Sequence, residues 1–575
     1  MSRFFRRTSM YYQLLGLTLL FVFAAGLAVL MGRYMSRVFR GQPTALDVLT
    51  PVERCIYRAG GIDPYQSMTW QQYALSLLTI NSIWLAYALL ALRTQASIPF
   101  WNQGGIPSMD WSLAINTAIS FLTSTNLQHY SGESGATYFT QMAVLTFLQF
   151  VSAATSLAVG VAVVRSLQAK TSSNVGNFYQ DFVLSITRVF LPLSVLGAVW
   201  LLLRGVPMTF QPYTLIHTLE GVEQTVATGP VAAMIPIKHL GSNGGGFFGT
   251  NTAHPFENPD MVSYGINLIN VLLLPIAFVV FVGYFLHRKK LAWLLFTIMT
   301  GCWLALTLPI IQQELTGNTA VSLLGVDQSM GNLEGKEMRF GTLGSAFWCG
   351  VNVVIPAGTL TSMHDSYTPL ASLFMLLGMQ VDAFYGGVGT GFLYMFLYLI
   401  IAIFIGSLMI GRTPELLGKK VGIPEIQVAA LIMVIMPLLY LGATAIAVAI
   451  QQANPDIGWL SNPGFHGFTT ILYEYVSSVA GNGSGFEGLA DNTPFWNLTT
   501  SFVMFMGRFI PLIGPLAIAG SLYRKQYTPP SAGVLPTESV TFGILVTAVV
   551  LIIGALCTFP ALALGPIAEY VSQAK

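Results

Sequence analysis

The chain has 575 residues, of which 54% are hydrophobic and only 9% are charged, whereas charged residues make up about a quarter of a soluble domain. This composition excludes an ordinary soluble protein and predicts a multi-pass membrane protein. The formal net charge of +2 is scattered over short basic clusters, so no nucleic-acid-binding surface is expected.

Apolar stretches of the chain predict the helices that cross the membrane. Ten are expected, at residues 12–31, 70–91, 138–164, 182–203, 261–286, 291–311, 370–410, 426–450, 495–522 and 540–559. The seventh is too long for one simple span and contains a glycine cluster. That cluster predicts a break in the helix near the middle of the membrane.

The basic residues indicate how the spans are oriented. Fifteen Lys and Arg residues follow odd-numbered spans, and nine, among them Lys238 and Lys336, lie on the opposite side. Because cytoplasmic loops are enriched in Lys and Arg, the first side is expected to be cytoplasmic and both termini external. Three arginines near the N-terminus, Arg3, Arg6 and Arg7, argue locally for the reverse orientation.

Four polar, glycine-bearing segments interrupt the apolar chain, at residues 123–126, 242–246, 356–359 and 481–484. With Asn126, Gly244, Gly358 and Gly483 as markers, their spacings are 118, 114 and 125 residues. Such regular spacing predicts four copies of one membrane unit. Irregular backbone inside a membrane is tolerated only where protein buries it or where it lines a watery cavity, so the four segments are expected to surround one pore.

A short amphipathic helix is expected before each segment, at residues 111–122, 231–240, 343–354 and 468–480. Each is too short to cross a bilayer of about 30 Å at about 1.5 Å per residue, so each is expected to enter the membrane and stop halfway. Its partly negative C-terminal end then points inward and favours a cation. Four ordinary exterior loops are the alternative interpretation.

The residue types in these turns suit a dehydrated monovalent cation. Glycine permits positive φ and close approach, so a short run can aim backbone carbonyls at one axis. Potassium is the natural candidate, because acidic side chains inside the turns would suit divalent ions better and none is present. Acidic residues after the turns are expected to concentrate cations at the mouth, unless they are merely solvated loop charges: Glu133, Glu257, Asp365, Glu487 and Asp491.

Several longer motifs carry a family resemblance. They are Ser242-Asn-Gly-Gly-Gly-Phe-Phe, His254-Pro-Phe-Glu-Asn-Pro259, Asn332-Leu-Glu-Gly-Lys-Glu337, Met363-His-Asp-Ser366 and Gly411-Arg-Thr-Pro-Glu415. Over nearly its whole length the chain resembles the potassium-binding subunits (KdpA) of the bacterial Kdp potassium-transporting ATPase. The resemblance implies an all-α membrane protein of the superfamily of potassium transporters, with four outer-helix, pore-helix, inner-helix repeats around a pseudo-fourfold pore.

Applied to this chain, that plan gives an extra helix at each end of the four repeats. The extra helices are expected at residues 12–31 and 538–560, and the repeats at residues 70–165, 180–287, 291–411 and 424–523. The resemblance also implies a potassium selectivity filter at Ser124, Asn126, Ser242, Gly244, Pro356, Gly358, Gly481 and Gly483. Potassium is the expected ligand, and neither an organic cofactor nor a transition-metal site is expected.

Two filter positions depart from the pattern expected of the family. Pro356-Ala-Gly358 stands where Ser-Cys-Gly is expected, and Gly481 stands where an asparagine is expected. The first turn is also unequal to the others, since Asn126 replaces a glycine. These departures matter little if backbone carbonyls coordinate the ion, and they alter affinity if a side-chain oxygen contributes.

Charges inside the spans are candidates for controlling ion passage. Asp382 precedes the glycine cluster at 385–391, and a broken helix beside a charge is typical of a transport site. The resemblance implies a gating loop there, with Asp382, Gly386, Gly387 and Arg508 as the candidate residues. A structural ion pair is the alternative for Arg508, and it is the favoured interpretation for Arg188 in the fourth span.

The predicted function is the potassium-selective subunit of an ATP-driven uptake complex that takes potassium from outside. No segment of the chain is suited to hold ATP, so the chain is not expected to be catalytic alone. The resemblance implies a P-type ATPase subunit as motor, a small accessory subunit and a single-span subunit as further partners, membrane lipid, and the bacterial inner membrane as location. A self-sufficient potassium channel or cation-coupled potassium symporter remains the alternative, and a lipid-modifying enzyme would need a catalytic cluster that the sequence does not show.

Overall fold

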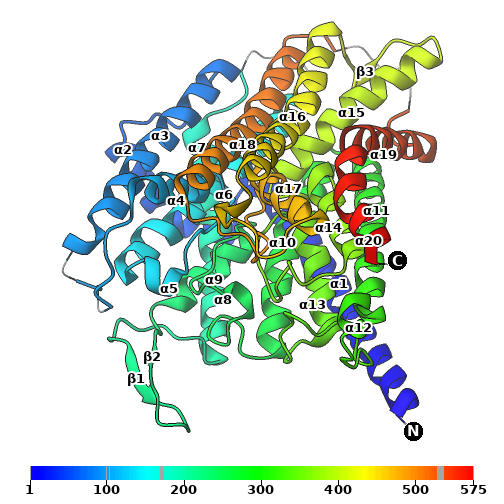
Figure 1. Cartoon of the computed structure of the whole chain (residues 1–575). Coiled ribbons are helices and arrows are strands. Elements are labelled where there is room, and N and C mark those ends of the chain that lie inside the picture. Colours follow the sequence, from blue (N-terminus) through cyan, green and yellow to red (C-terminus); the bar gives the residue numbers. More distant parts are fainter. Residues whose placement is uncertain (1, 99, 103, 169–173, 528–535, 574–575) are drawn as a thin grey trace.

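The computed structural model describes residues 2–98, 100–102, 104–168, 174–527 and 536–573, and long helices dominate it (Figure 1). In the described residues, ten helical segments are long and apolar enough to cross a membrane. These segments are Tyr11–Val38, Trp70–Ser97, Thr140–Gln168, Phe178–Leu203, Met261–Phe285, Lys289–Leu323, Thr390–Met409, Ile423–Ala453, Pro494–Tyr523 and Val540–Gln573. The predicted number of spans is confirmed, although most are longer than their apolar stretches suggest.

Between the first helix, α1 (Ser2–Val38), and the last long one, α19 (Val540–Leu562), the chain repeats one order of helices: outer, pore, inner. The first repeat has α3 (Trp70–Thr94), α4 (Trp111–Leu122) and the π-helical η3 (Thr140–Thr146) continued by α6 (Phe147–Gln168). The second has α7 (Phe178–Leu184), η4 (Ser185–Phe190) and α8 (Leu191–Leu203), then α9 (Val231–Leu240) and α10 (Met261–Phe285).

The third repeat has α11 (Lys289–Thr316), α13 (Gly341–Val354), and an inner helix in two pieces, α14 (Pro369–Val381) and α15 (Thr390–Met409). The fourth has α16 (Ile423–Ala453), α17 (Phe465–Ala480) and α18 (Pro494–Tyr523). The predicted fold class is therefore confirmed. The predicted break in the seventh span is also present, since α14 ends at Val381 and α15 begins only at Thr390.

Local sequence signals explain where several of these helices begin. Thr69 before α3 accepts the amide of Gln72, Asp260 before α10 accepts those of Val262 and Ser263, and Thr493 before α18 accepts that of Trp496. Such caps satisfy amides that have no partner inside the helix. These caps determine where α3, α10 and α18 begin, and each of these spans is next to a pore helix in the chain.

The inner helices form the core of the molecule, and the outer helices form its apolar surface. In η3 with α6, in α10 and in α15, most residues of the apolar stretch are buried inside the protein. In α1, α3 and α16, only a minority of these residues are buried. Exposed apolar side chains on these outer helices, such as Leu19, Leu75 and Leu431, suit contact with lipid. The four pore helices therefore lie inside a lipid-facing wall.

Short elements lie in the connections or extend the ends of the long helical segments. They are η1 (Ala45–Leu49), α2 (Thr50–Ala59), η2 (Gln95–Ser97), α5 (Gly132–Gly135), η5 (Asn251–Ala253), α12 (Thr319–Leu323), η6 (Pro455–Ile457), η7 (Ala563–Ile567), α20 (Ala568–Gln573), and two antiparallel pairs, β1 (Thr214–His217) with β2 (Glu223–Val226) and β3 (Glu415–Leu416) with β4 (Lys419–Lys420). The start of α1, the β1–β2 hairpin and α12 lie at one end of the molecule, and β3 lies at the other (Figure 1). Which end faces the cytoplasm stays a prediction.

Arg188, in η4, forms the structural ion pair that its position favours. Its guanidinium contacts Glu53 at 2.6 Å and Asp47 at 2.5 Å. Both carboxylates come from the connection between the first two spans. The charge is thus neutralised within the fold and needs no role in transport.

Candidate ion-binding site

The four polar turns, which are far apart in the sequence, meet at one place. A Cβ at Gly244 would lie 2.5 Å from the carbonyl oxygen of Thr125, 2.6 Å from that of Asn482 and 3.1 Å from the Cα of Gly358. One point of the second turn is therefore in contact range of the other three. All eight residues predicted for the filter belong to these converging turns.

Carbonyl oxygens crowd this meeting point so closely that side chains are excluded. A Cβ at Gly358 would overlap the carbonyl oxygen of Asn482, and a Cβ at Gly483 would overlap that of Thr125. Thr125 and Asn482 are the middle residues of their turns, and both are fully buried. Sequence reasoning named their neighbours and missed these two, although their place between two named residues was a usable signal.

The backbone of the turns is left-handed at six of the eight predicted positions. The φ angles are 66° at Ser124, 55° at Asn126, 51° at Ser242, 57° at Gly358, 69° at Gly481 and 90° at Gly483. Non-glycine residues rarely adopt such angles, and where they do the position is often functional. The two exceptions are Gly244 and Pro356. The ring of Pro356 fixes φ near −65°, so the first filter residue of the third turn differs in geometry from the first filter residues of the other three turns.

Hydrogen bonds to the pore helices determine which way the peptide groups face. The bonds are Asn126 N–H to Ser120 O at 3.0 Å, Asn243 N–H to Lys238 O at 2.8 Å and Asn482 N–H to Ser477 O at 2.9 Å. In a trans peptide the preceding carbonyl points opposite to the N–H. The carbonyls of Thr125, Ser242 and Gly481 are thereby turned away from the pore helices.

Side-chain amides brace the turns against one another. The Asn243 Oδ1 accepts from Ser124 Oγ at 2.8 Å and from Asn126 Nδ2 at 3.2 Å, which joins the first and second turns. The Asn482 Nδ2 donates to the carbonyl of Asn352, in the third pore helix, at 2.8 Å. Asn126 thus adopts the positive φ expected of the glycine that it replaces, and its side chain also gains a bracing role.

A cavity lies beside the turns, next to the break between α14 and α15. Its lining includes the first predicted filter residue of every turn together with residues of the break and of α18: Ser124, Ser242, Pro356, Gly481, Asp382, Gly387 and Arg508. Its volume is about 20 Å³, enough for one water molecule or a dehydrated ion of similar size. Ser242 Oγ and Asp382 Oδ1 are buried and have no hydrogen-bond partner among the residues that the structure describes.

The break between α14 and α15 is irregular and close to the turns. Positive φ angles occur at Asp382 (45°), Tyr385 (70°), Gly386 (52°) and Gly389 (84°). A Cβ at Gly387 would lie 3.8 Å from the Cβ of Ser242 in the second turn. Three of the four predicted gating residues, Asp382, Gly387 and Arg508, therefore line this cavity, and Gly386 lies on the same loop.

Arg508 differs from Arg188 in the groups that its guanidinium contacts. Its guanidinium donates to the Ser152 carbonyl at 3.2 Å and to the Ser156 hydroxyl. In the described part of the chain, no ion pair joins it to Asp382, although both line the cavity. The structural ion pair considered for Arg508 is therefore absent here.

Glu257, one of the acidic residues expected at the pore mouth, is instead buried in the protein. Glu257 is fully buried and pairs with Lys238 at 2.7 Å. A buried, paired carboxylate adds no free charge that could concentrate cations. The expectation of a mouth charge was therefore wrong for this residue.

Known proteins similar to the chain share nearly its full length. The family model described as "Potassium-transporting ATPase A subunit" matches residues 18–571. The potassium-transporting ATPase potassium-binding subunit of Flavobacterium johnsoniae is 47% identical, covering 97% of this chain and 99% of that protein. The protein of the same name from Flavobacterium psychrophilum is 46% identical with the same coverage. The crystal structure of the potassium transporter TrkH from Vibrio parahaemolyticus aligns with a TM-score of 0.49 and 14% identity, covering 86% of this chain and 96% of that one.

Proposed function

Because the chain belongs to the family of potassium-transporting ATPase A subunits, we propose that it is the potassium-selective subunit of an ATP-driven uptake complex. Potassium enters from the external side and passes through a filter lined by the carbonyl oxygens of the four turns. The observation that carries this proposal is the convergence of Thr125, Gly244, Gly358 and Asn482 at one point.

Potassium fits the chemistry of these turns. A cation that enters them must exchange its hydration shell for protein oxygens. The oxygens on offer are neutral carbonyls, since none of the four turns contains an acidic residue. Neutral carbonyls suit a monovalent ion, whereas calcium and magnesium are usually bound with the help of carboxylates. The bracing amides of Asn243 and Asn482 would keep the carbonyls at a fixed spacing.

The loop between α14 and α15 is the gate in this proposal. Arg508 places a positive charge on the wall of the cavity, and Asp382 places a carboxyl group on the same wall. At short range and low dielectric, the first repels a cation and the second attracts it. A movement of the loop that carries Asp382, Gly386 and Gly387 would change the balance and admit the ion to the cavity.

The relatives' names describe one subunit of a larger assembly. We infer that a P-type ATPase subunit supplies the energy, and that a small accessory subunit, a single-span subunit and membrane lipid complete the complex. Potassium is the transported ligand, and no organic cofactor is assigned to this chain. We place the complex in the bacterial inner membrane with both termini of this chain external.

Reconstitution tests the proposal. The complex and the isolated chain are placed separately in vesicles, and potassium uptake is followed with and without ATP on the cytoplasmic side of the ATPase subunit. Uptake that requires both ATP and the ATPase subunit supports the proposal. Rapid potassium flux through the isolated chain without ATP would instead favour the self-sufficient channel or symporter.

A further inference from the structure

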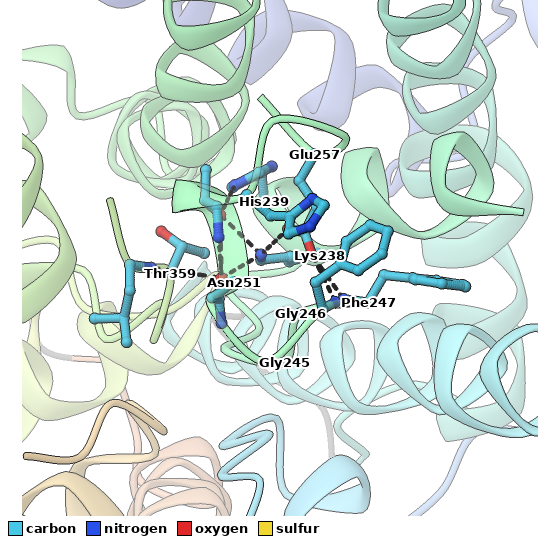
Figure 2. A network of polar contacts seen from close by, with 12 residues as sticks. Lys238, His239, Gly245, Gly246, Phe247, Asn251, Glu257 and Thr359 are labelled. Carbon is cyan, nitrogen blue, oxygen red and sulfur yellow. Dashed lines mark hydrogen bonds and ion pairs between the residues drawn. The ribbon is translucent and has the colours of Figure 1, made fainter. Parts of the chain in front are cut away.

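A lysine lies fully buried in the last turn of the second pore helix. Lys238, on α9, donates to Glu257 Oε2 at 2.7 Å and to Asn251 Oδ1 (Figure 2). It also donates to Thr252 Oγ1 at 2.8 Å. All three hydrogens of the ammonium group are therefore used. Burying a charge is costly unless it is paired, and Glu257 supplies the opposite charge here.

Asn251 connects this lysine to the second turn. An ammonium group can only donate, so the amide oxygen of Asn251 faces Lys238, and the Thr252 amide donates to the same oxygen at 2.8 Å. The amide nitrogen is consequently turned the other way. It donates to the carbonyl oxygen of Gly244 at 2.7 Å, which leaves the second lone pair of that carbonyl for another partner.

Glu257 holds the backbone just after the turn. Its Oε2 pairs with Lys238, and its Oε1 accepts the amides of Phe247 at 2.7 Å and Phe248 at 3.1 Å. The ion pair therefore supports the second turn in two places, through Asn251 at Gly244 and through the amides of Phe247 and Phe248 just after the turn. Because the charge of Glu257 partly offsets that of Lys238, the pair repels a passing cation less than an unpaired lysine would.

We propose that Lys238 and Asn251 are positioning residues that determine how the Gly244 carbonyl faces the ion, and so tune ion affinity and selectivity. This inference rests on the proposed filter. Without the ammonium group the Asn251 amide is held only by its weaker neutral partners. Without the amide the Gly244 carbonyl loses its donor and is free to tilt.

A second buried ion pair in the same molecule provides a matched control. Lys336 contacts Glu314 at 2.7 Å, and both side chains are fully buried, as in the first pair. The Glu314 carboxylate accepts from Asn332 Nδ2 and from the Thr368 amide, each at 2.9 Å. In the described part of the chain, neither this pair nor these two partners hydrogen-bonds to a residue of the four turns. The second pair therefore has the same charges without a link to the filter.

The test compares Lys238→Met with Lys336→Met in the complete complex. Isothermal titration measures potassium and rubidium affinity, and thermal unfolding measures stability. We expect both variants to melt at a lower temperature, but only Lys238→Met to bind potassium severalfold more weakly with a potassium-to-rubidium ratio closer to one. Equal effects of both variants on binding, or wild-type binding by a folded Lys238→Met, would overturn the proposal.

Asn251→Gly decides the question if Lys238→Met does not fold. This variant keeps the pair of Lys238 with Glu257, and glycine readily adopts the φ of 55° found at this position. Loss of the one hydrogen bond that Asn251 gives to the Gly244 carbonyl is expected to weaken potassium binding up to about tenfold. A folded Asn251→Gly with unchanged affinity and ion ranking would show that the Gly244 carbonyl needs no support.

A parallel Gly358→Ser variant separates this inference from the proposed function. If Gly358→Ser weakens potassium binding while Lys238→Met and Asn251→Gly do not, the filter stands and only the positioning role is wrong. If Gly358→Ser binds potassium normally, the ion site lies elsewhere and the proposed function itself fails.

Discussion

Replacing Gly358 by serine should weaken potassium binding and reduce discrimination against rubidium. The φ of Gly358 is 57°, a left-handed angle that costs a residue with a Cβ about 1–2 kcal/mol. The new Cβ would also overlap the Asn482 carbonyl oxygen and the Cα of Gly244. Since every 1.4 kcal/mol corresponds to about a tenfold change, a loss of about tenfold or more in affinity is expected if this strain is borne by the ion site.

Isothermal titration of the purified complex with potassium and then rubidium measures this effect. Gly341→Ser is the matched control, because Gly341 has a similar φ of 64° and no atom within 4 Å of its Cβ position. The control should lose some stability and retain its ion affinities. A folded Gly358→Ser with wild-type affinity and ion ranking would refute the account of the filter.

The remaining predictions concern the gate, the energy source and a histidine at the start of α17. Asp382→Asn should leave potassium affinity intact, because the four turns are unchanged. It should change potassium flux in vesicles or the coupling of that flux to ATP hydrolysis. Wild-type flux together with wild-type coupling would show that Asp382 has only a structural role. The rigorously purified chain should hydrolyse no ATP, and potassium-stimulated hydrolysis should appear only with its ATPase partner. Burial alone would lower the pKa of His466, but hydrogen bonds with Asp365 and Glu569, both at 2.9 Å, raise that pKa from 6.5 to about 10. These bonds therefore stabilise the fold fully below pH 6.5, and their stabilisation is lost as the pH rises through about 10. The difference in melting temperature between wild type and His466→Gln should shrink across that range. A constant difference would contradict the raised pKa of His466.

The helices of the pore could be predicted well because their signals are local. The segments expected at 111–122 and 231–240 coincide with α4 and α9. Polar turns at regular intervals stand out against an apolar chain, and the glycine cluster after Asp382 indicated the broken helix. Each of these features depends on composition within a short window.

Features that depend on tertiary packing could not be predicted in this way. Lys238 and Lys336 were counted as basic residues on the external side, but both side chains are buried in ion pairs with distant glutamates. Arg188 and Arg508 look alike as charges inside spans. Only the fold shows that the first is paired with carboxylates and that, among the described residues, the second is not. Sequence also could not show which carbonyls face the meeting point, because that depends on hydrogen bonds from each turn to its pore helix.

The central claim is that one dehydrated potassium ion binds where the four turns meet. Crystals of the complex soaked in a rubidium salt would locate such an ion by its anomalous scattering. We expect a peak at the point where Thr125, Gly244, Gly358 and Asn482 converge. Well-ordered turns with no peak between them, and a strong peak at another site in the membrane, would contradict it.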